Sequence, residues 1–156
     1  MASPDVEDIT DALMTVFQSQ FAAELQNVDQ AKATPLNPKP PVAWLFGETP
    51  TLPQMPVMIF EGLNAKQKED HYEWRNQTYH FGIEAYVTAD DVQKLNRIIR
   101  RYGTAIDNLL RANQNVGGAK NLTNIELNFS GLLTNKNTSG LFRAVSVTFD
   151  ATVITD

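Results

Sequence analysis

The clearest pattern of apolar and polar positions lies between residues 77 and 112, where a strand-like alternation is followed directly by a helix-like repeat. From residue 77 to residue 88 apolar side chains occupy every second position, as in a strand with one buried face. The apolar side of this strand consists of Tyr79, Phe81, Ile83, Ala85 and Val87. The following repeat has helical spacing and consists of Val92, Leu95, Ile99, Tyr102, Ile106 and Leu109. Asp90 and Gln93 are spaced as in a capping box, so an amphipathic helix is predicted to begin there and to pack on the sheet.

A second amphipathic helix is predicted near the N-terminus. Ser3 is placed to cap it, Pro4 takes the first helical position, and acidic side chains follow near the positive end of the helix dipole. A continuous apolar stripe then runs to about Asn27 and consists of Val6, Ile9, Leu13, Val16, Phe17 and Leu25. We therefore expect this helix to pack against the same sheet.

Proline dominates residues 31–56, which we treat as a proline-rich connector and insertion. Residues 31–41 hold four of the eight prolines. Because each proline ring fixes φ and removes a backbone donor, this stretch is predicted to be neither a helix nor a central strand. It is interpreted as a loop, with an arm that reaches a neighbouring molecule as the alternative.

Two short apolar runs, residues 42–46 and 57–60, are predicted to be strands because they are too short for helices and are flanked by prolines. Neither run alternates with polar residues, so both sides of these strands need cover. Only two long helices are predicted, and the side that they leave uncovered is a candidate contact surface for another subunit. The candidate contact residues in these runs are Trp44, Phe46, Met58 and Phe60.

Residues 62–76 are polar and charged, with Tyr72 and Trp74 as aromatic exceptions. One interpretation continues the following strand outward as a projecting hairpin arm, with these two aromatics on one side and Arg75 on the other. The other interpretation is a solvated loop whose aromatics fold back on the domain. Because aromatic side chains are enriched at interfaces, Tyr72, Trp74 and Arg75 are candidate contacts with another subunit.

Two further strands are predicted near the C-terminus. Residues 113–120 end the second long helix, and Ile125, Leu127 and Phe129 then alternate with polar residues. After a turn at residues 135–140, the last strand spans residues 141–154. One side of it carries Arg143, Val145, Val147, Phe149, Ala151 and Val153. These two strands are expected to pair as a hairpin, so the predicted class is α+β: an antiparallel or mixed sheet with two long helices packed on one face.

Composition narrows the class of protein further. A length of 156 residues with 42% hydrophobic residues suits a single domain, residues 1–156, with an ordinary core. The net charge of −5 argues against a protein whose main work is to hold nucleic-acid backbones. The absence of cysteine excludes disulfides and thiolate chemistry. The start of the chain does not resemble a signal peptide, and no apolar run is long enough to span a bilayer, so cytoplasmic synthesis without membrane contact is expected.

The sequence contains only weak candidates for a chemical site. His80 and Glu84 share one side of a predicted strand, and His71 has Glu73 close by, which is the pairing that a metal or acid–base site uses. The pattern lacks a third clear ligand and a glycine turn that would stabilise an oxyanion. We therefore predict a protein that is not an enzyme, with no catalytic residue, metal or cofactor. A small ligand-binding or enzymatic domain with a pocket near His80 and Glu84 is the alternative from a different class.

Basic residues gather on the second long helix of an otherwise acidic chain. The cluster consists of Lys94, Arg97, Arg100, Arg101 and Arg111. Such a run is usually the solvated face of an amphipathic helix. In an oligomer it has a second interpretation, in which the cluster meets the acidic start of a neighbour and orients assembly through complementary charge. That acidic segment carries Asp5, Glu7, Asp8 and Asp11.

Several short phrases together resemble the tail-terminator or tail-completion proteins of long-tailed bacteriophages. They are the acidic N-terminal helix, Pro-Val-Met-Ile-Phe-Glu-Gly at residues 56–62, Glu-Ala-Tyr-Val at residues 84–87, an Asp-initiated helix with Arg101-Tyr102 and Ala105-Ile106, and Phe142-Arg143-Ala144 in the last strand. The likeness covers most of the domain, from Asp5 to Val153. It rests on element order and short apolar phrases, and no invariant chemical motif accompanies it.

The resemblance implies a structural virion protein that forms a ring, expected to be a homohexamer, on the head-proximal end of the viral tail tube. Such a ring ends tube polymerisation and joins the tail to the head connector, and it assembles in the host cytoplasm. The implied partners are copies of the chain, the tail tube protein and the head connector or neck protein. DNA is expected to pass through the lumen without specific binding, which the acidic balance of the chain suits. A head–tail neck or adaptor protein of the same particle is the nearest alternative.

Overall fold

The computed structural model describes the backbone of residues 4–47, 54–71, 74–134 and 141–155. Tyr72 and the side chains of Trp74 and Arg75 lie outside the described part, so their predicted contacts stay predictions. The helices are α1 (Val6–Gln30) and α2 (Val92–Ala112), followed by a short 3₁₀ turn, η1 (Val116–Gly118). The strands are β1 (Ala43–Phe46), β2 (Val57–His71), β3 (Trp74–Thr88), β4 (Asn121–Phe129), β5 (Leu133–Thr134) and β6 (Leu141–Thr155).

The first helix, α1, begins with a cap that differs from the prediction. Its N-cap is Asp5, not Ser3, because Asp5 and Asp8 form a reciprocal capping box. The Asp8 backbone N–H donates to Asp5 Oδ1 at 2.9 Å, and the Asp5 backbone N–H donates to Asp8 Oδ2 at 3.1 Å. The helix continues to Gln30, beyond the predicted end near Asn27. Its buried stripe includes Ile9, Leu13, Phe17, Phe21, Leu25 and Val28.

The second helix, α2, packs one apolar stripe on the sheet, as its helical spacing predicts. Its N-cap is Asp91 rather than Asp90, because the Asp91 side chain accepts the Gln93 backbone N–H at 2.8 Å. This correction moves the start by one residue and leaves the stripe unchanged. The buried residues of α2 include Leu95, Ile99, Tyr102, Ile106 and Leu109.

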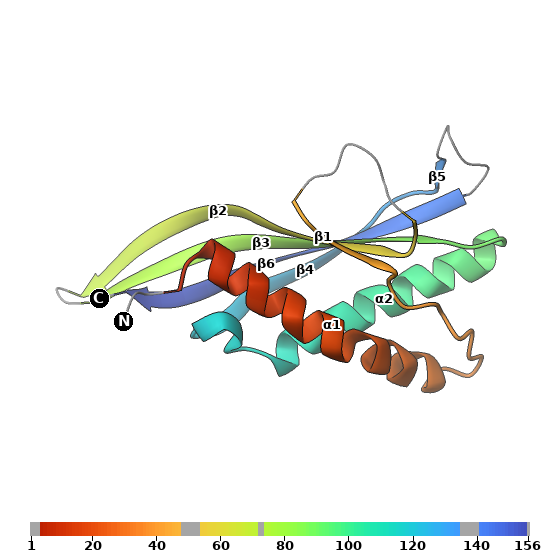
Figure 1. The fold of residues 1–156 in the computed structure, drawn as a ribbon, viewed down its shortest axis with the longest axis horizontal. Helices are drawn as coiled ribbons and strands as arrows, with labels where there is room; N and C mark the ends of the chain where they lie inside the picture. The colour runs from red at the N-terminus through yellow and green to blue at the C-terminus, as the bar shows by residue number, and fades with distance from the viewer. Residues whose placement is uncertain (1–3, 48–53, 72–73, 135–140, 156) are drawn as a thin grey trace.

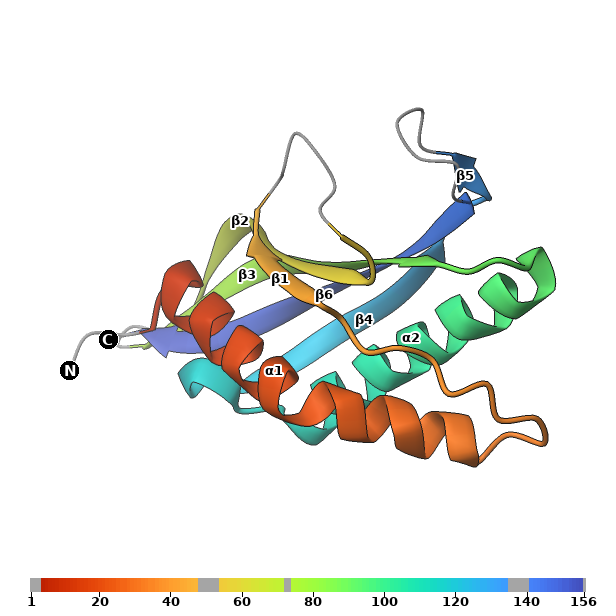
Figure 2. The same ribbon diagram turned by 45° about the vertical axis from the view of Figure 1, so that its right-hand side comes forward.

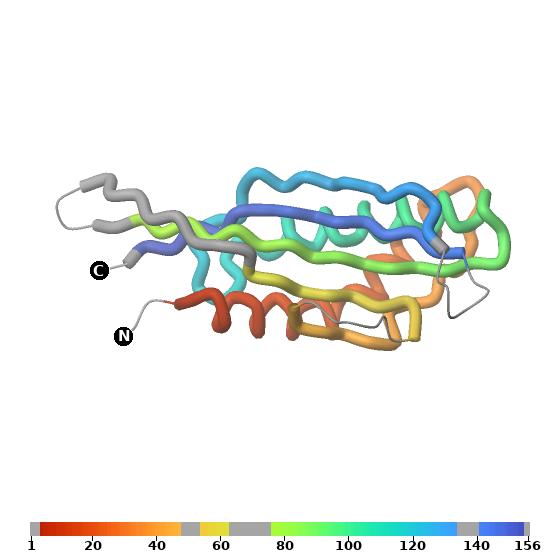
Figure 3. The backbone as a smooth tube through the Cα atoms, turned by 90° about the horizontal axis from the view of Figure 1, so that it is seen from above, coloured from red at the N-terminus to blue at the C-terminus, as the bar shows by residue number. Residues whose placement is uncertain are grey.

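The strands form one mixed sheet in the order β1-β2-β3-β6-β4, and β5 pairs with β6 beside them. β1 and β2 are parallel, and the other described pairs are antiparallel. Both helices lie on the same side of this sheet (Figure 1). The predicted α+β class is therefore confirmed, and so is the pairing of β4 with β6. β1 and β4 form opposite edges of the sheet, as the view from above shows (Figure 3).

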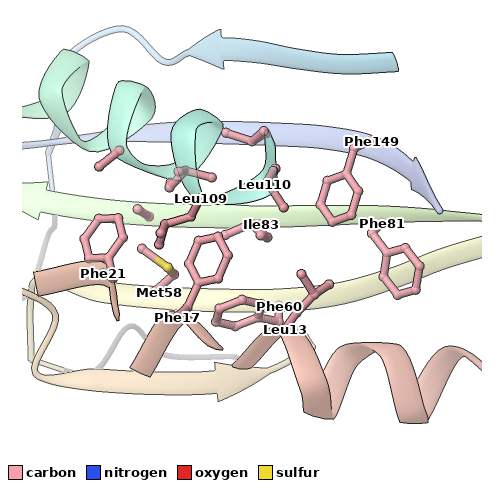
Figure 4. Packing of buried hydrophobic residues seen from close by; sticks show 14 of the residues in the cluster. Leu13, Phe17, Phe21, Met58, Phe60, Phe81, Ile83, Leu109, Leu110 and Phe149 are labelled. Atoms are coloured by element: carbon pink, nitrogen blue, oxygen red, sulfur yellow. The ribbon is translucent and has the colours of Figure 1, made fainter. Parts of the chain in front are cut away.

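The core lies between the sheet and the two helices (Figure 2). The alternating residues of β3 that the sequence assigned to the inner side are all buried. Large aromatic side chains fill the layer: Phe17 of α1 lies against Phe60 of β2, and Phe81 of β3 stacks on Phe149 of β6 (Figure 4). The Phe17 and Phe60 rings meet edge to face, with centroids 5.5 Å apart. Burial of this apolar layer is the main force that holds the helices on the sheet.

The face of the sheet opposite the helices does not match the expectation of an uncovered apolar surface. Val57 and Ile59 point to that face from β2, and both are buried within the subunit. The prediction that a neighbour must cover this side of β2 is therefore wrong, because the chain itself covers it. On the central strands the same face is polar and partly exposed, and it carries His80, Glu84, Ser146, Thr148 and Asp150.

The connector after α1 lies against its own subunit. The backbone N–H groups of Leu36 and Asn37 donate to the Asp29 carboxylate, each at 3.0 Å. Further along, the Tyr102 hydroxyl donates to the Lys39 carbonyl oxygen. These contacts match the interpretation of residues 31–41 as a loop, because they satisfy polar groups of the connector within the same chain.

The backbone of residues 62–71 and 74–76 belongs to long paired strands. β2 and β3 pair as far as His71 and Trp74, with register shifts after Gly62 and after Glu69. β6 continues beside β3 as far as the pair of Arg75 with Thr155. A side chain at Gly62 would overlap Val6, because β2 passes close to the start of α1 there. The strands then continue past the beginning of this helix (Figure 1). The backbone therefore has the hairpin geometry, and its contact with a neighbour stays a prediction.

Candidate assembly surfaces

The edge strand β4 borders a groove of about 540 Å³ beside α2. We call it the β4-edge groove, and its lining includes Ile99, Arg100, Thr104, Leu127, Phe129 and Arg143. Phe129 is 46% exposed, one of the large apolar side chains that the described chain leaves to solvent. Gly103 allows this approach, because a Cβ there would lie 3.0 Å from both Leu127 and Phe129 side chains. The groove therefore combines an open apolar wall with positive charge.

Polar atoms in the β4-edge groove are not fully used within the subunit. Arg143 donates through Nη1 to the Ser130 carbonyl oxygen at 3.0 Å. In the part of the chain that the structure describes, its buried Nε has no hydrogen-bond partner, and neither does the buried Oδ1 of Asn96. Because an unpaired buried polar atom costs free energy, these two atoms are a local cost to the stability of the fold beside the groove.

A second, basic pocket of about 320 Å³ adjoins this groove, since Arg100 and Thr104 line both. The basic pocket lies between α2 and the residues that follow α1, and its lining includes Lys32, Thr34, Arg97, Arg100, Arg101 and Thr104. No carboxylate is among its lining residues. Lys32, Arg97 and Arg100 are exposed and make no ion pair within the described residues.

Arg101 differs from both interpretations of the basic cluster, because it is only 5% exposed and is paired within the subunit. Its Nη1 contacts the Asp29 carboxylate, and its Nη2 donates to the Thr34 carbonyl oxygen at 2.9 Å. Burial by itself raises the pKa of Asp29, but the amides of Leu36 and Asn37 and the Arg101 guanidinium lower it more, so the pKa lies below its ordinary value. Arg101 is therefore a structural residue that forms the inner wall of the basic pocket.

The opposite edge of the sheet carries an acidic and apolar surface. Phe46 of β1 is 54% exposed. It borders a hollow of about 450 Å³, the β1-edge pocket, whose lining includes Glu7, Thr10, Phe46, Phe60, Glu61 and Gly62. Asp5 and Asp8 belong to the same first turns of α1; burial is the main cause that raises the pKa of Tyr79, and the charges of these two aspartates raise it further. Glu7 and Asp11 are also exposed, so the start of α1 presents four carboxylates.

The two exposed phenylalanines lie almost level across the sheet. The register pairs Phe46 with Phe60, Phe60 with Ile83, Ile83 with Val147 and Val147 with Leu127, which form one row perpendicular to the strands. Phe129 lies two residues further along β4, on the same helix-covered side as Leu127. The β1-edge pocket and the β4-edge groove therefore face outward from opposite ends of nearly the same row.

Three other predicted contact residues belong to the subunit's own interior or its margin. Met58 and Phe60 are buried in the core, so the folded subunit does not offer their side chains to a neighbour. Trp44 is half-buried, and its ring lies 6.3 Å from Phe21 and 6.2 Å from Phe60, measured between centroids. Both runs form strands, as predicted, although the second is only the start of the long β2, and of the four candidate residues Phe46 alone is exposed.

On the polar face, the carboxylate beside His80 is not Glu84, with which the sequence pattern grouped it. His80 contacts Asp150, its cross-strand neighbour on β6, and Asn124 Nδ2 donates to the other Asp150 oxygen at 2.8 Å. Glu84 instead accepts from the Tyr86 hydroxyl at 3.0 Å, and burial followed by the Glu84 charge raises the pKa of Tyr86 to about 12. No group of three metal-ligating side chains occurs among the described residues.

Sequence reasoning missed the residues that define the β4-edge groove. Leu127 and Phe129 appeared as ordinary inward positions of a strand, and Arg143 appeared as one position in the inner row of the last strand. The signal that could have found them is the polar sequence on both sides of residues 121–130, which is typical of an edge strand. Only the strand order shows that nothing in the described chain lies beyond β4.

Comparison with known proteins adds no assignment, because no protein-family model and no curated protein matches this chain. In the described part of the chain, none of the helices is long and apolar enough to cross a membrane. The surfaces at the two sheet edges are thus the features from which function has to be inferred.

Proposed function

We propose that this chain is a structural virion protein that assembles as a ring on the head-proximal end of the tail tube of a long-tailed bacteriophage. In this role it ends tube polymerisation and joins the tail to the head connector. The resemblance of residues 5–153 to tail-terminator proteins supplies the role, and the α+β fold with two helices on one sheet face agrees with it. The partners are other copies of the chain, the tube protein and the connector.

The observation that carries the assembly is the exposure of one phenylalanine at each edge of the sheet. Phe46 and Phe129 lie on the two terminal strands, on the same helix-covered side and at nearly the same level. Two different surfaces at opposite ends of one molecule associate head to tail, and repeated head-to-tail contacts close into a ring when the rotation between copies permits it. A ring buries both side chains at every contact.

Variants of the two edges test this assembly. We expect Phe46→Ser and Phe129→Ser each to raise the concentration needed for association by about tenfold or more, because interface aromatics contribute strongly to binding. Sedimentation velocity and native mass spectrometry measure the mass, and circular dichroism checks the fold. Ile154→Ser is the matched control, since Ile154 is also exposed but lies on the far face of β6. A wild-type protein that stays monomeric at all concentrations contradicts the proposal.

The place in the particle needs a separate experiment. Tails assembled with and without the protein are compared by electron microscopy, and the wild type is expected to give tubes of uniform length with a ring at the head-proximal end. Unlimited tube growth without the protein supports a terminator. Tubes of normal length that fail only to join heads assign the protein to the neck instead, which is the alternative position in the same particle.

A further inference from the structure

The start of α1 is acidic, whereas the residues that follow its end border a basic pocket. The acidic start of α1, which consists of Asp5, Glu7, Asp8 and Asp11, lies beside the β1-edge pocket. The other end of the helix leads directly into Lys32 and Thr34, which line the basic pocket. Within the described residues no cation pairs with the four carboxylates, and Lys32, Arg97 and Arg100 have no acidic partner. The described part of the subunit therefore leaves two complementary surfaces unpaired.

Each charged surface accompanies one exposed phenylalanine. Glu7 and Phe46 line the same β1-edge pocket. At the other edge, Arg100 lines both the basic pocket and the β4-edge groove that contains Phe129. A contact that brings the two apolar edges together thus brings an acidic surface toward a basic one. Complementary charge of this kind orients association and disfavours the reversed arrangement.

We propose that the basic pocket binds the acidic start of α1 from a second copy of this chain, an inference that rests on the head-to-tail ring proposed above. Glu7 and Asp11 supply the carboxylates, and Arg97 and Arg100 supply the guanidinium groups, which bind carboxylates through paired N–H donors. Asp5 and Asp8 already accept backbone hydrogen bonds in the capping box. The contact makes the assembly directional, because acid meets base only when every copy faces the same way.

A second copy is favoured over a nucleic acid as the occupant. The chain carries a net charge of −5, so its overall field repels a polyanion, whereas the exposed carboxylates of another copy are part of every assembly. The buried guanidinium of Arg101 is already neutralised by Asp29, which leaves a small number of free cations in the pocket. A few free cations match the few carboxylates of a short acidic segment.

Charge reversal gives a test with internal complementation. The first variant carries Arg97→Glu with Arg100→Glu, and the second carries Glu7→Lys with Asp11→Lys. Each variant alone places like charges at every contact, so we expect its association to need at least about tenfold more protein than the wild type. In an equimolar mixture alternate copies restore opposite charges at every contact, and rings are expected to form again. Native mass spectrometry reads the composition, and alternating rings contain equal numbers of both variants.

The controls separate this inference from the proposed function. Lys120→Glu changes an exposed charge outside both surfaces and is expected to leave association unchanged. The inference is wrong if the wild type forms rings and both reversed variants form them equally well. It is also wrong if the mixture fails to restore assembly. In either case the proposed head-to-tail ring itself is not contradicted. If the wild type never associates, the proposed function fails first. A duplex oligonucleotide that binds the wild type but not Arg97→Glu with Arg100→Glu assigns the pocket to phosphate and also overturns the inference.

Discussion

At the scale of single residues, Asp29 and Arg101 decide how the connector leaves α1. The Asp29 side chain is 1% exposed, yet it receives two backbone N–H groups and the Arg101 guanidinium. These donors replace the water that burial removes from a charged carboxylate. The pair therefore fixes residues 34–37 against α2 and shapes the inner wall of the basic pocket.

Removal of this carboxylate is expected to be costly. Asp29→Ala leaves a buried guanidinium and two backbone N–H groups without their acceptor, so the free energy of unfolding is expected to fall by about 3–5 kcal/mol. Urea denaturation followed by circular dichroism measures the change. Asp107→Ala is the matched control, because it removes an exposed pair with Arg111 at 3.0 Å that contributes about 0.3–0.5 kcal/mol. Equal losses in the two variants contradict the role given to Asp29.

The same carboxylate predicts a dependence of stability on pH. The pKa of Asp29 in the folded protein lies below its ordinary value of 3.8, so the folded state prefers the charged form. Its contribution to stability is present above the ordinary pKa and is lost as the pH falls through the folded-state pKa. We therefore expect the difference in unfolding free energy between the wild type and Asp29→Asn to be smaller at about pH 3 than at about pH 7. A difference that stays constant over this range contradicts the assignment.

At the scale of elements, the short turn η1 connects α2 to the sheet and also packs against α1. Gly117 has a positive φ of 63°, and a Cβ there would lie 2.9 Å from the Ile9 Cα and 3.2 Å from the Ala12 Cβ. The backbone of η1 thus approaches the first helix more closely than any side chain permits. This contact holds the beginning of α1 near the end of α2.

A side chain at this position is expected to push the two elements apart. Gly117→Ala combines a strained left-handed backbone with a clash against helix backbone, so a loss of about 1–3 kcal/mol in unfolding free energy is expected. Thermal and urea denaturation measure it. At Gly131 a Cβ would meet no atom within 4 Å, so Gly131→Ala is expected to be nearly neutral. The prediction is wrong if both alanines behave alike.

At the scale of the whole molecule, charge and apolar exposure follow the same direction across the sheet. The β1 edge carries Phe46 beside carboxylates, and the β4 edge carries Phe129 beside arginines. In the proposed ring, apolar burial drives the association of these edges and charge directs it, and the two contributions respond differently to solution conditions.

Salt concentration separates the two contributions. We expect the association to weaken as the ionic strength rises from about 0.05 M to about 0.5 M, because exposed charges are screened over shorter distances. The charge-reversed variants described above are expected to show the opposite trend, since screening relieves their repulsion. Sedimentation velocity at several salt concentrations measures both. A wild-type association that strengthens steadily with salt indicates apolar contact without electrostatic orientation.

Local patterns predicted most of the elements. Alternation identified the inner faces of β3 and β6, and helical spacing identified the stripes of α1 and α2, because burial of one face imposes these periods on the sequence. The ends of helices were less certain, since several acidic residues in succession can each serve as a cap. Asp5 and Asp91 therefore replaced the predicted Ser3 and Asp90.

Partners distant in sequence were not predictable in the same way. His80 was paired with Glu84 on its own strand, whereas the register of β3 and β6 brings it to Asp150. Arg101 was grouped with exposed cations, whereas Asp29 lies opposite it in the folded chain and buries its charge. Both corrections depend on long-range pairing, on which the local pattern of polar residues carries little information.

The sequence by itself determined the α+β class, the two amphipathic helices and the inner faces of the long strands, because local periodicity and solvent exclusion act on each segment separately. Tertiary structure decided which strands lie at the edges, which charges are neutralised, and which apolar residues stay exposed. These properties depend on strand order and register, which bring together segments that are far apart along the chain. The opposed surfaces of Phe46 and Phe129 exist only at that level.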